Sequence, residues 1–259
     1  LFESAYYASS NSHSHLHFTI SETHQSQFEN IVDTFKASIE KQSGTTIDVS
    51  YSFQNKKTDS IAVNPDNSPF RSTEGELAFR PGGHGALIEN LNNLDADIIF
   101  IKNIDNVIQN NLEKIALYKK GLAGILIELQ QQIFTYLNEI ETHKIEQENI
   151  DEIILFLKEK LNTKISDDIH AFSFENKIAK IKEALNKPIR VCGMVKNEGE
   201  PGGGPFWVRD EKGNLSLQIV ESSQVDLTNT HQQKILESAT HFNPVDLVCG
   251  IKNYKNEKF

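Results

Sequence analysis

Phe79-Arg80-Pro81-Gly82-Gly83-His84-Gly85-Ala86-Leu87, followed by Asp97-Ile98-Ile99-Phe100-Ile101-Lys102-Asn103-Ile104-Asp105-Asn106, is the part of the sequence that decides the expected fold. Glycines at 82, 83 and 85 let the backbone approach a flat or phosphorylated ligand where a Cβ would collide. Residues 87–93 predict a short helix, and the apolar run 98–101 suits a parallel strand covered on both faces. The stretch therefore predicts a ligand loop, a helix and a buried strand. Asp105 would then lie at the carboxyl edge, where open α/β sheets bind ligands.

The preceding residues predict a strand, a helix and a second strand. Residues 15–20 and 46–53 have the apolar spacing of strands. Between them, Ser21 is a suitable N-cap for a helix that runs to about Lys41, with a buried stripe expected from Ile31, Phe35 and Ile39. This order is typical of a parallel sheet. We therefore expect an α/β fold with a mixed, mostly parallel sheet and helices on both faces.

The middle of the chain predicts a helical insertion. Apolar residues from Leu112 to Ile140 recur at threes, fours and sevens, and residues 150–161 and 172–185 form two more amphipathic patterns. The strand pattern returns after Pro188. We expect an α/β domain made of residues 1–110 and 187–259, with residues 111–186 as a helical subdomain. The chain begins as if inside a helix, so we expect a fragment of a longer polypeptide.

Composition limits the partners. The 259 residues include 26 Lys and Arg against 36 Asp and Glu, and a net charge of −10 disfavours a nucleic-acid partner. A local basic pocket for a small phosphorylated ligand remains compatible with that charge. No apolar run approaches the ~20 residues that cross a bilayer, so we expect no membrane partner. Cys192 and Cys249 lie in apolar runs, which predicts reduced core cysteines in a cytoplasmic protein.

The first candidate site is the 81–85 loop with the acid that follows the apolar strand. The loop opens a helix whose amides could hold an anion, and His84 could donate to a ligand; the alternative is a turn that only joins two elements. Asp105 could bind magnesium, or Asp105 and Asn106 could simply cap the next helix. Lys102 could offset phosphate charge, and the further candidate cations are Arg80 and Lys119.

Further candidates lie near the two ends of the chain. Gly202, Gly203 and Gly204 precede the single tryptophan, Trp207, which suits a ligand loop, although two adjoining β-turns explain it as well. Glu221 ends an apolar strand, where it could accept hydrogen bonds from a sugar or pair with Arg190 or Arg209. The alternating histidines 13, 15 and 17 share one face of a strand, but without a carboxylate cluster the pattern favours an ordinary strand face over a metal site.

The strings Arg-Pro-Gly-Gly-His-Gly (80–85) and Gly-Glu-Pro-Gly-Gly-Gly-Pro-Phe-Trp (199–207) resemble a bacterial family labelled only as a domain of unknown function. The order of motifs is also similar to that of UDP-sugar pyrophosphorylases, above all the UDP-N-acetylhexosamine pyrophosphorylases, which have a GT-A-like nucleotidyltransferase fold. The motifs that carry this resemblance are Ile20-Ser21, Gln54, residues 81–85, Asp105-Asn106 and residues 219–223.

The resemblance implies that Gln54 and Gly83 face a uracil, that Asp105 holds Mg²⁺, and that Glu221 contacts the sugar. Asn243 corresponds to a later position near the sugar. His84 stands where those enzymes have Asn, and Ser222-Ser223 replaces Tyr-Ser. The triphosphate loop and the catalytic lysine of that family have no counterpart in the chain, so the chain alone is expected to be inactive.

The resemblance thus implies an enzyme that transfers a uridylyl group from UTP to a sugar 1-phosphate and releases pyrophosphate. Its small-molecule partner would be a nucleoside triphosphate or a nucleotide sugar. A non-catalytic nucleotide-sugar-binding or regulatory protein is the alternative. A glycosyltransferase is a third reading, which ranks lower because Asn103-Ile104-Asp105 stands where those enzymes have Asp-x-Asp.

Overall fold

The computed structural model describes residues 1–104, 107, 110–165, 167–199 and 202–259. The chain forms two compact units. Unit 1 contains residues 1–96 and 112–117, and unit 2 contains residues 97–111 and 118–259. The described part is a mixture of helices and several small sheets, so the broad α/β class is confirmed.

Unit 1 begins with helix α1 (Phe2–Tyr7) and then has the expected strand, helix and strand. Strand β1 (His13–Thr19) and strand β2 (Thr46–Ser52) pair in parallel, from His13 opposite Thr46 to Thr19 opposite Ser52. A 3₁₀ turn (Glu22–His24) leads into α2 (Gln25–Ser43), which ends at Gly44 in the left-handed conformation, as a C-terminal glycine does. The strand, helix and strand prediction for this region is therefore confirmed.

The predicted buried stripe of α2 is wrong at Ile31 and Phe35, whereas Ile39 is half-buried. Ile31 and Phe35 are 58% and 54% exposed, whereas Val32 is 7% exposed and Phe28 packs its ring against Phe18 at a centroid distance of 5.5 Å. Both sets of residues satisfy the helical period, and only the position of the β1–β2 pair selects between them.

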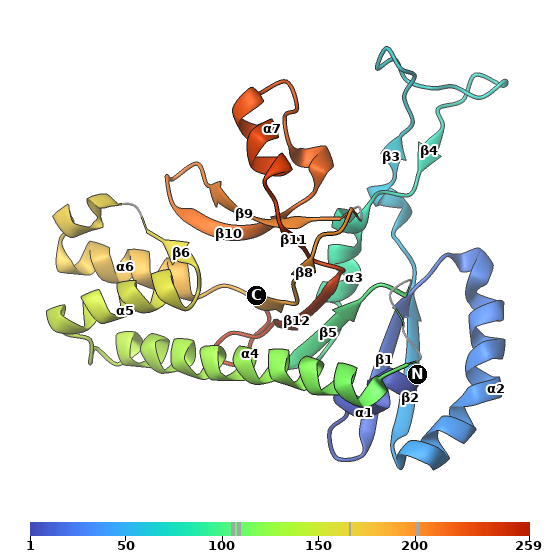
Figure 1. The fold of residues 1–259 in the computed structure, drawn as a ribbon, viewed down its shortest axis with the longest axis horizontal. Helices are drawn as coiled ribbons and strands as arrows, with labels where there is room; N and C mark the ends of the chain where they lie inside the picture. Colours follow the sequence, from blue (N-terminus) through green and yellow to red (C-terminus); the bar gives the residue numbers. More distant parts are fainter. Residues whose placement is uncertain (105–106, 108–109, 166, 200–201) are drawn as a thin grey trace. The chain divides into compact units, whose positions relative to one another are not determined.

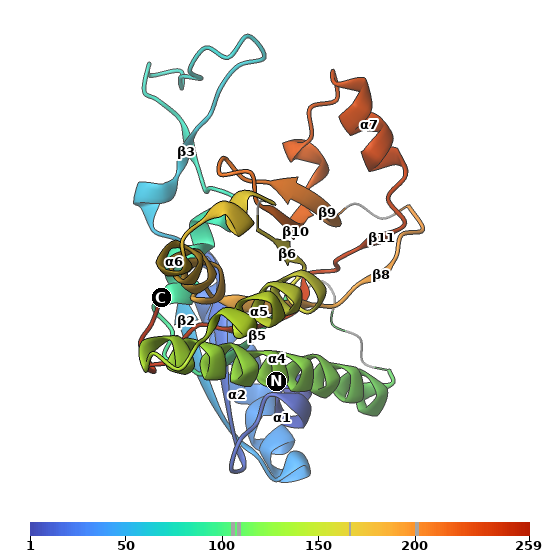
Figure 2. The same cartoon turned by 90° about the vertical axis from the view of Figure 1, so that its left-hand side faces the viewer.

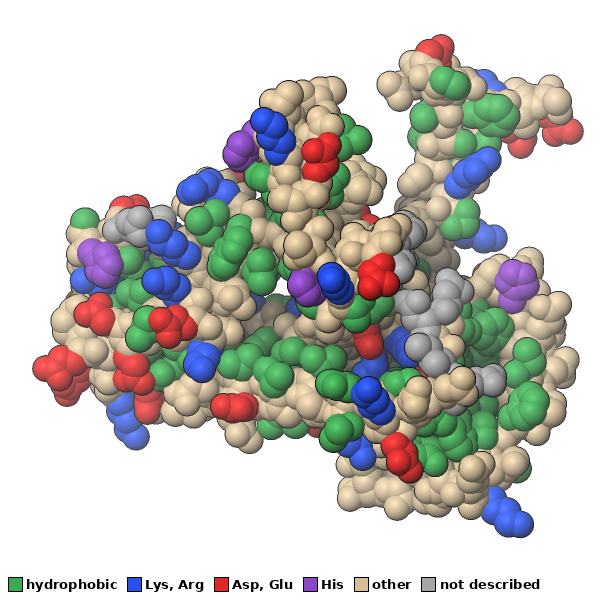
Figure 3. All heavy atoms as spheres, viewed as in Figure 1, with side chains coloured by type: hydrophobic (Ala, Val, Ile, Leu, Met, Phe, Trp, Pro, Cys, Tyr) green, Lys and Arg blue, Asp and Glu red, His purple; other side chains and the backbone are tan. Residues whose placement is uncertain are grey.

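The next part of unit 1 contains a two-stranded arm and the glycine loop. Strand β3 (Ser60–Ile61), which follows a 3₁₀ turn (Lys56–Thr58), pairs antiparallel with β4 (Phe79–Arg80), and Figure 1 shows the intervening chain extending beyond the pair. Apolar side chains lie along this arm in the space-filling view (Figure 3). After the loop come a 3₁₀ turn (His84–Leu87) and α3 (Ile88–Asn92), in agreement with the short helix expected at 87–93.

Unit 2 is built on antiparallel sheets. Strand β12 (Asp246–Gly250) lies between β5 (Ile98–Lys102) and β7 (Ile189–Cys192) and is antiparallel to both. The parallel pairing expected for residues 98–101 is therefore not the pairing that the structure describes. An apolar run is compatible with either direction, and the strand that supplies the partner comes almost 150 residues later in the sequence.

Two smaller sheets of unit 2 are also antiparallel. One has the order β6 (Thr163–Lys164), β10 (Leu215–Val220) and β9 (Gly204–Arg209), and the other pairs β8 (Val195–Lys196) with β11 (His241–Phe242). Within the described residues, β1 and β2 form the parallel pair and the other ladders are antiparallel, so a mostly parallel sheet is not shown. Unit 2 also has a 3₁₀ turn (Ser222–Gln224) and α7 (Thr230–Glu237), which the sequence patterns did not indicate.

The apolar core of unit 2 lies among three helices. Helices α4 (Leu112–Glu141), α5 (Gln147–Glu159) and α6 (Phe174–Leu185) lie side by side (Figures 1 and 2), and a 3₁₀ turn (Asp167–Ala171) adds Ile169 to their core. The buried members include Ile150, Ile153, Leu157 and Ile181, each 1% exposed or less. The helices expected in the middle of the chain are confirmed; the proposed domain boundaries at 110 and 187 stay a prediction. In the described residues no helix has the length and apolarity required to span a bilayer.

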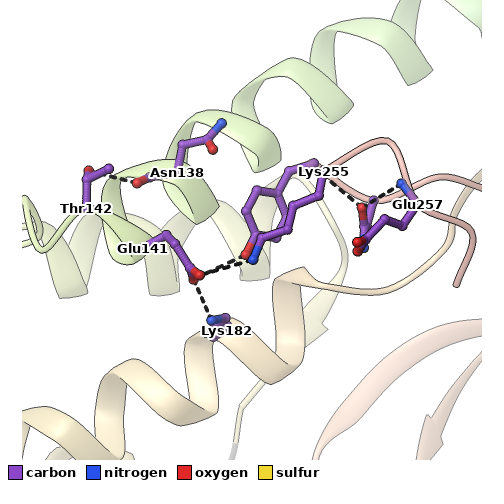
Figure 4. A network of polar contacts seen from close by, with 8 residues as sticks. Asn138, Glu141, Thr142, Lys182, Lys255 and Glu257 are labelled. Atoms are coloured by element: carbon purple, nitrogen blue, oxygen red, sulfur yellow. Dashed lines mark hydrogen bonds and ion pairs between the residues drawn. The ribbon is translucent and has the colours of Figure 1, made fainter.

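A carboxylate ties the C-terminal segment to these helices (Figure 4). Glu141, at the end of α4, accepts hydrogen bonds from Lys182 at 2.8 Å, from Lys255 at 3.1 Å and from the hydroxyl of Tyr254 at 3.2 Å. The bonds from Lys182 and Lys255 lower the pKa of Glu141 to about 2. The same residue therefore joins α4, α6 and the last turn of the chain.

Candidate functional site

The structure brings Gln54 next to the glycine loop in unit 1. A Cβ built on Gly82 would lie 2.8 Å from the carbonyl oxygen of Thr58 and 3.5 Å from Nε2 of Gln54. The Gln54 amide also donates to Oδ1 of Asp59 at 3.2 Å. Glycine at position 82 is thus required by the close approach of two backbones, which places the loop against the chain that leaves β2.

Gly83 and Gly85 are different. Apart from its chain neighbours, no described atom would lie within 4 Å of a Cβ on either residue, and neither residue has a positive φ. Neither packing nor backbone conformation therefore requires glycine at these two positions. Pro81 and Gly83 are exposed and Gly82 is half-buried. The side chain of His84 lies outside the described part of the structure.

His15 and His17 of β1 contact polar side chains of β2. His15 lies 3.4 Å from Asp48 and is exposed, and the described residues contain no group of three or more His, Cys, Asp and Glu side chains that could hold a metal ion. His17 instead lies 2.8 Å from the hydroxyl of Ser50 and 2.8 Å from that of Ser52. Burial lowers the pKa of His17 below its usual value, which favours the neutral ring near pH 7.

The candidate cations are divided between the two units. Arg80 is exposed at the end of β4 in unit 1, whereas Lys102 ends β5 in unit 2 and is in register with Asp246. Lys119 pairs with Asp246 and is only 3% exposed, while its neighbour Tyr118 is 68% exposed. Asp105 and Asn106, the predicted metal ligand and its neighbour, lie outside the described residues, so the magnesium site stays a prediction.

The second glycine loop, Glu221 and Asn243 come together within unit 2. A Cβ on Gly203 would lie 2.5 Å from Cγ2 of Ile219 and 3.2 Å from a carboxylate oxygen of Glu221. A Cβ on Gly202 would lie 2.9 Å from the ring of Phe242, and one on Gly204 would lie 2.8 Å from that of Phe206. Here the protein's own side chains explain why the positions are glycine.

Asn243 has a structural role in this cluster. The residue is 5% exposed, its Nδ2 donates to the carbonyl of Gly193 at 2.6 Å, and its Oδ1 accepts from the amide of Val245 at 3.0 Å. Its amide N–H also donates to the carbonyl of Gly203 at 2.8 Å. Because these bonds use both ends of its side-chain amide, Asn243 holds the loop, and its expected contact with a sugar stays a prediction.

Glu221 is exposed and forms a capping box with Gln224 at the following 3₁₀ turn. Its expected alternative partners bond elsewhere, since Arg190 donates to Gln218 at 2.6 Å and Arg209 to the carbonyl of Gly213 at 3.2 Å. Among the sugar-binding candidates, Glu221 therefore keeps a carboxylate at the surface.

The whole chain, residues 1–259, matches the model of the family described as "Domain of unknown function (DUF4301)". The chain belongs to the DUF4301 family. No curated protein and no solved structure matches it. The resemblance of the 80–85 and 199–207 strings to a family labelled as a domain of unknown function is thus confirmed. The relationship to UDP-sugar pyrophosphorylases gains no support from these comparisons.

Sequence patterns missed two residues that attach α3, the helix after the glycine loop, to the end of β2. Ser52 and Asn90 are linked by a hydrogen bond of 2.8 Å, although they lie 38 positions apart in the chain. The residue types carry little signal, because serine at a strand end and asparagine in a short helix are common. An asparagine among apolar positions of a helix was the available clue, since a buried amide requires partners.

Proposed function

We propose that this DUF4301 protein binds a nucleotide at the 81–85 loop beside Gln54, and that it transfers a uridylyl group from UTP to a sugar 1-phosphate. The observation that carries the proposal is the pair Gly83 and Gly85. Since neither the packing of the described residues nor the backbone conformation requires glycine at these positions, the missing side chains leave room for a ligand that approaches the main chain.

The other residues would act on different parts of the ligand. In unit 1, Gln54 offers an amide that can both donate to and accept from a base edge, and Arg80 supplies positive charge for phosphates. The candidates of unit 2 are Lys102, a further cation, and Glu221, which offers an exposed carboxylate to sugar hydroxyls. Gly202, Gly203 and Gly204 would support Glu221 by packing and not by contact with the ligand. Asp105 and phosphate oxygens would hold Mg²⁺, which would neutralise phosphate charge.

The reaction requires no covalent intermediate on the protein. An oxygen of the sugar phosphate attacks the α-phosphorus of UTP, a new phosphorus–oxygen bond forms, and the bond to the β-phosphate oxygen breaks as pyrophosphate leaves. The residues named above position the reactants and offset their charge. A GT-A-like arrangement of the sheet is part of this proposal.

The test uses the full protein with UTP, a set of sugar 1-phosphates and Mg²⁺, and it measures pyrophosphate release. Asp105→Ala is expected to abolish magnesium-dependent turnover, while the matched control Asp66→Ala, which changes an exposed acid of the arm, is expected to retain it. Unchanged turnover in Asp105→Ala would remove that residue from the mechanism. A thermal shift with UDP-sugars but no pyrophosphate release from UTP would replace the enzyme with a binding protein.

A further inference from the structure

Ser52, the last residue of β2, is the centre of a hydrogen-bond network in unit 1. Its Oγ lies 2.8 Å from Nε2 of His17, 3.1 Å from the hydroxyl of Thr19 and 2.8 Å from Nδ2 of Asn90. Asn90 is 9% exposed and also donates from Nδ2 to the carbonyl of Phe53 at 2.9 Å. The network therefore joins β1, β2 and α3.

The three contacts use the full hydrogen-bonding capacity of the Ser52 hydroxyl. A hydroxyl has one hydrogen and two acceptor lone pairs. Asn90 can only donate from Nδ2, and a neutral His17 can accept from Ser52 while Thr19 donates to it. Although Ser52 contacts a histidine, this arrangement leaves it no lone pair for attack on a substrate. The geometry describes a fixed junction and not an activated nucleophile.

The hydrogen bonds of Ser52 and Asn90 connect the two segments of the proposed nucleotide site, which are the chain at Gln54 and the 81–85 loop. On one side, Phe53 is followed directly by Gln54. On the other side, Asn90 lies in α3, which follows the 3₁₀ turn at His84–Leu87 without a break, so consecutive helical turns connect Asn90 to the glycine loop. The distance between Gln54 and Gly83 is thus set through Asn90 as well as through the contact of Gly82 with Thr58.

We propose that His17, Ser52 and Asn90 are positioning residues that hold the 81–85 loop at the separation from Gln54 that a bound nucleotide requires. The ligand in this statement rests on the proposed function. The claim that these residues hold the loop in place does not rest on the proposed function, because it concerns the order of the loop in the ligand-free protein. A purely structural role would instead stabilise the whole of unit 1 and leave the loop no more affected than the rest.

The experiment compares full-length Ser52→Ala, Asn90→Leu and the conservative Ser52→Thr with wild type. The matched control is Thr34→Ala, which removes a hydroxyl that bonds only within α2. Hydrogen–deuterium exchange of residues 82–88 is measured without ligand, and affinity for UTP and UDP-sugars is measured by calorimetry. Melting temperature reports global stability.

We expect Ser52→Ala and Asn90→Leu to exchange about tenfold faster at residues 82–88 than wild type, as the loss of one or two hydrogen bonds allows. We also expect about tenfold weaker nucleotide binding, with Ser52→Thr and Thr34→Ala close to wild type. Faster exchange confined to the loop, in a protein that binds no nucleotide even as wild type, would support the positioning role and reject the proposed function. Unchanged loop exchange, or exchange raised equally throughout unit 1, would overturn the positioning role whatever the binding result.

Discussion

The ammonium group of Lys119 pairs with the carboxylate of Asp246, and the lysine is only 3% exposed. This pair fastens α4 to the first residue of β12, which is the middle strand of its sheet. Removing one partner of a buried pair leaves a charge without compensation and costs more than the pair contributes when intact.

Lys119→Met should therefore destabilise the protein by about 3 kcal/mol in chemical unfolding. The neighbouring Lys120→Met, at an exposed position of the same helix, should change stability by less than about 0.5 kcal/mol. The double variant Lys119→Met with Asp246→Leu should recover part of the loss. Equal effects at 119 and 120 would show that the pair contributes nothing to the attachment of α4.

Substitutions in the first glycine loop should distinguish a glycine that packing requires from a glycine that ligand binding requires. Gly82→Ala forces its Cβ against the backbone carbonyl of Thr58, so it should cost about 1–3 kcal/mol. Gly83→Ala meets open space and should leave the melting temperature within about 2 °C of wild type. If a nucleotide approaches the main chain there, Gly83→Ala should nevertheless weaken its binding in a calorimetric titration. Tight binding by Gly83→Ala would remove the argument on which the proposed function rests.

The second glycine loop should behave as a packing site. Gly203→Ala places a methyl group against Ile219 and should destabilise the protein by about 1–3 kcal/mol. The effect should shrink when the variant is combined with Ile219→Ala, because the two changes relieve the same contact. A double-mutant cycle measured by urea unfolding tests this, and simple additivity of the two costs would contradict the contact.

The Glu141 junction should make stability depend on acid pH. Its pKa in the folded protein is lowered from 4.5 to about 2 by the hydrogen bonds from Lys182 and Lys255, so its contribution is fully present above pH 4.5. That contribution should fall as the pH drops from 4.5 through about 2, where the folded protein finally takes up the proton. Unfolding free energies of wild type and Glu141→Gln, compared between pH 6 and pH 2.5, should converge at the acid end. A constant difference over that range would contradict the assignment.

The two cysteines should react slowly in the folded protein. Both are free thiols, and burial raises the pKa of Cys249 to about 11 and that of Cys192 above its usual value. Since the thiolate is the reactive form, an aromatic disulfide reagent at pH 8 should label both residues much faster in denaturant than in buffer. Rapid labelling of folded Cys192→Ser, which leaves only Cys249, would show that the β12 position is accessible.

Several elements were predictable because their signals are local. The β1–α2–β2 unit follows from strand periodicity, helix-length spacing and a glycine stop, and Gly44 takes the left-handed conformation that the stop requires. The buried face of α2 was not predictable, because Ile31 with Phe35 and Phe28 with Val32 fit the same period. The direction of β5 was hidden for a related reason, since an apolar strand carries no record of its partner's direction.

For the candidate site, too, the sequence predicted the local motifs and only the structure showed their contacts. The glycine patterns at 82–85 and 202–204 stand out in the sequence. Only the contacts show that protein atoms occupy the space where a side chain would lie at Gly82 and Gly203, while no described atom occupies that space at Gly83. Lys119 follows the exposed Tyr118 in a run whose sequence predicts a solvated helix face. Its burial is known only from the structure, which pairs it with Asp246 of β12.

The sequence by itself determined membership of the DUF4301 family, the order of most helices and strands, and the positions of the two glycine loops, because each depends on neighbouring residues. Only the tertiary structure decided that β12 pairs antiparallel with β5 and β7, that Asp246 receives Lys119, and that Asn90 joins Ser52. Those contacts join residues far apart in the chain. Their free energy comes from burial and hydrogen bonding between whole elements, which no local pattern of residues records.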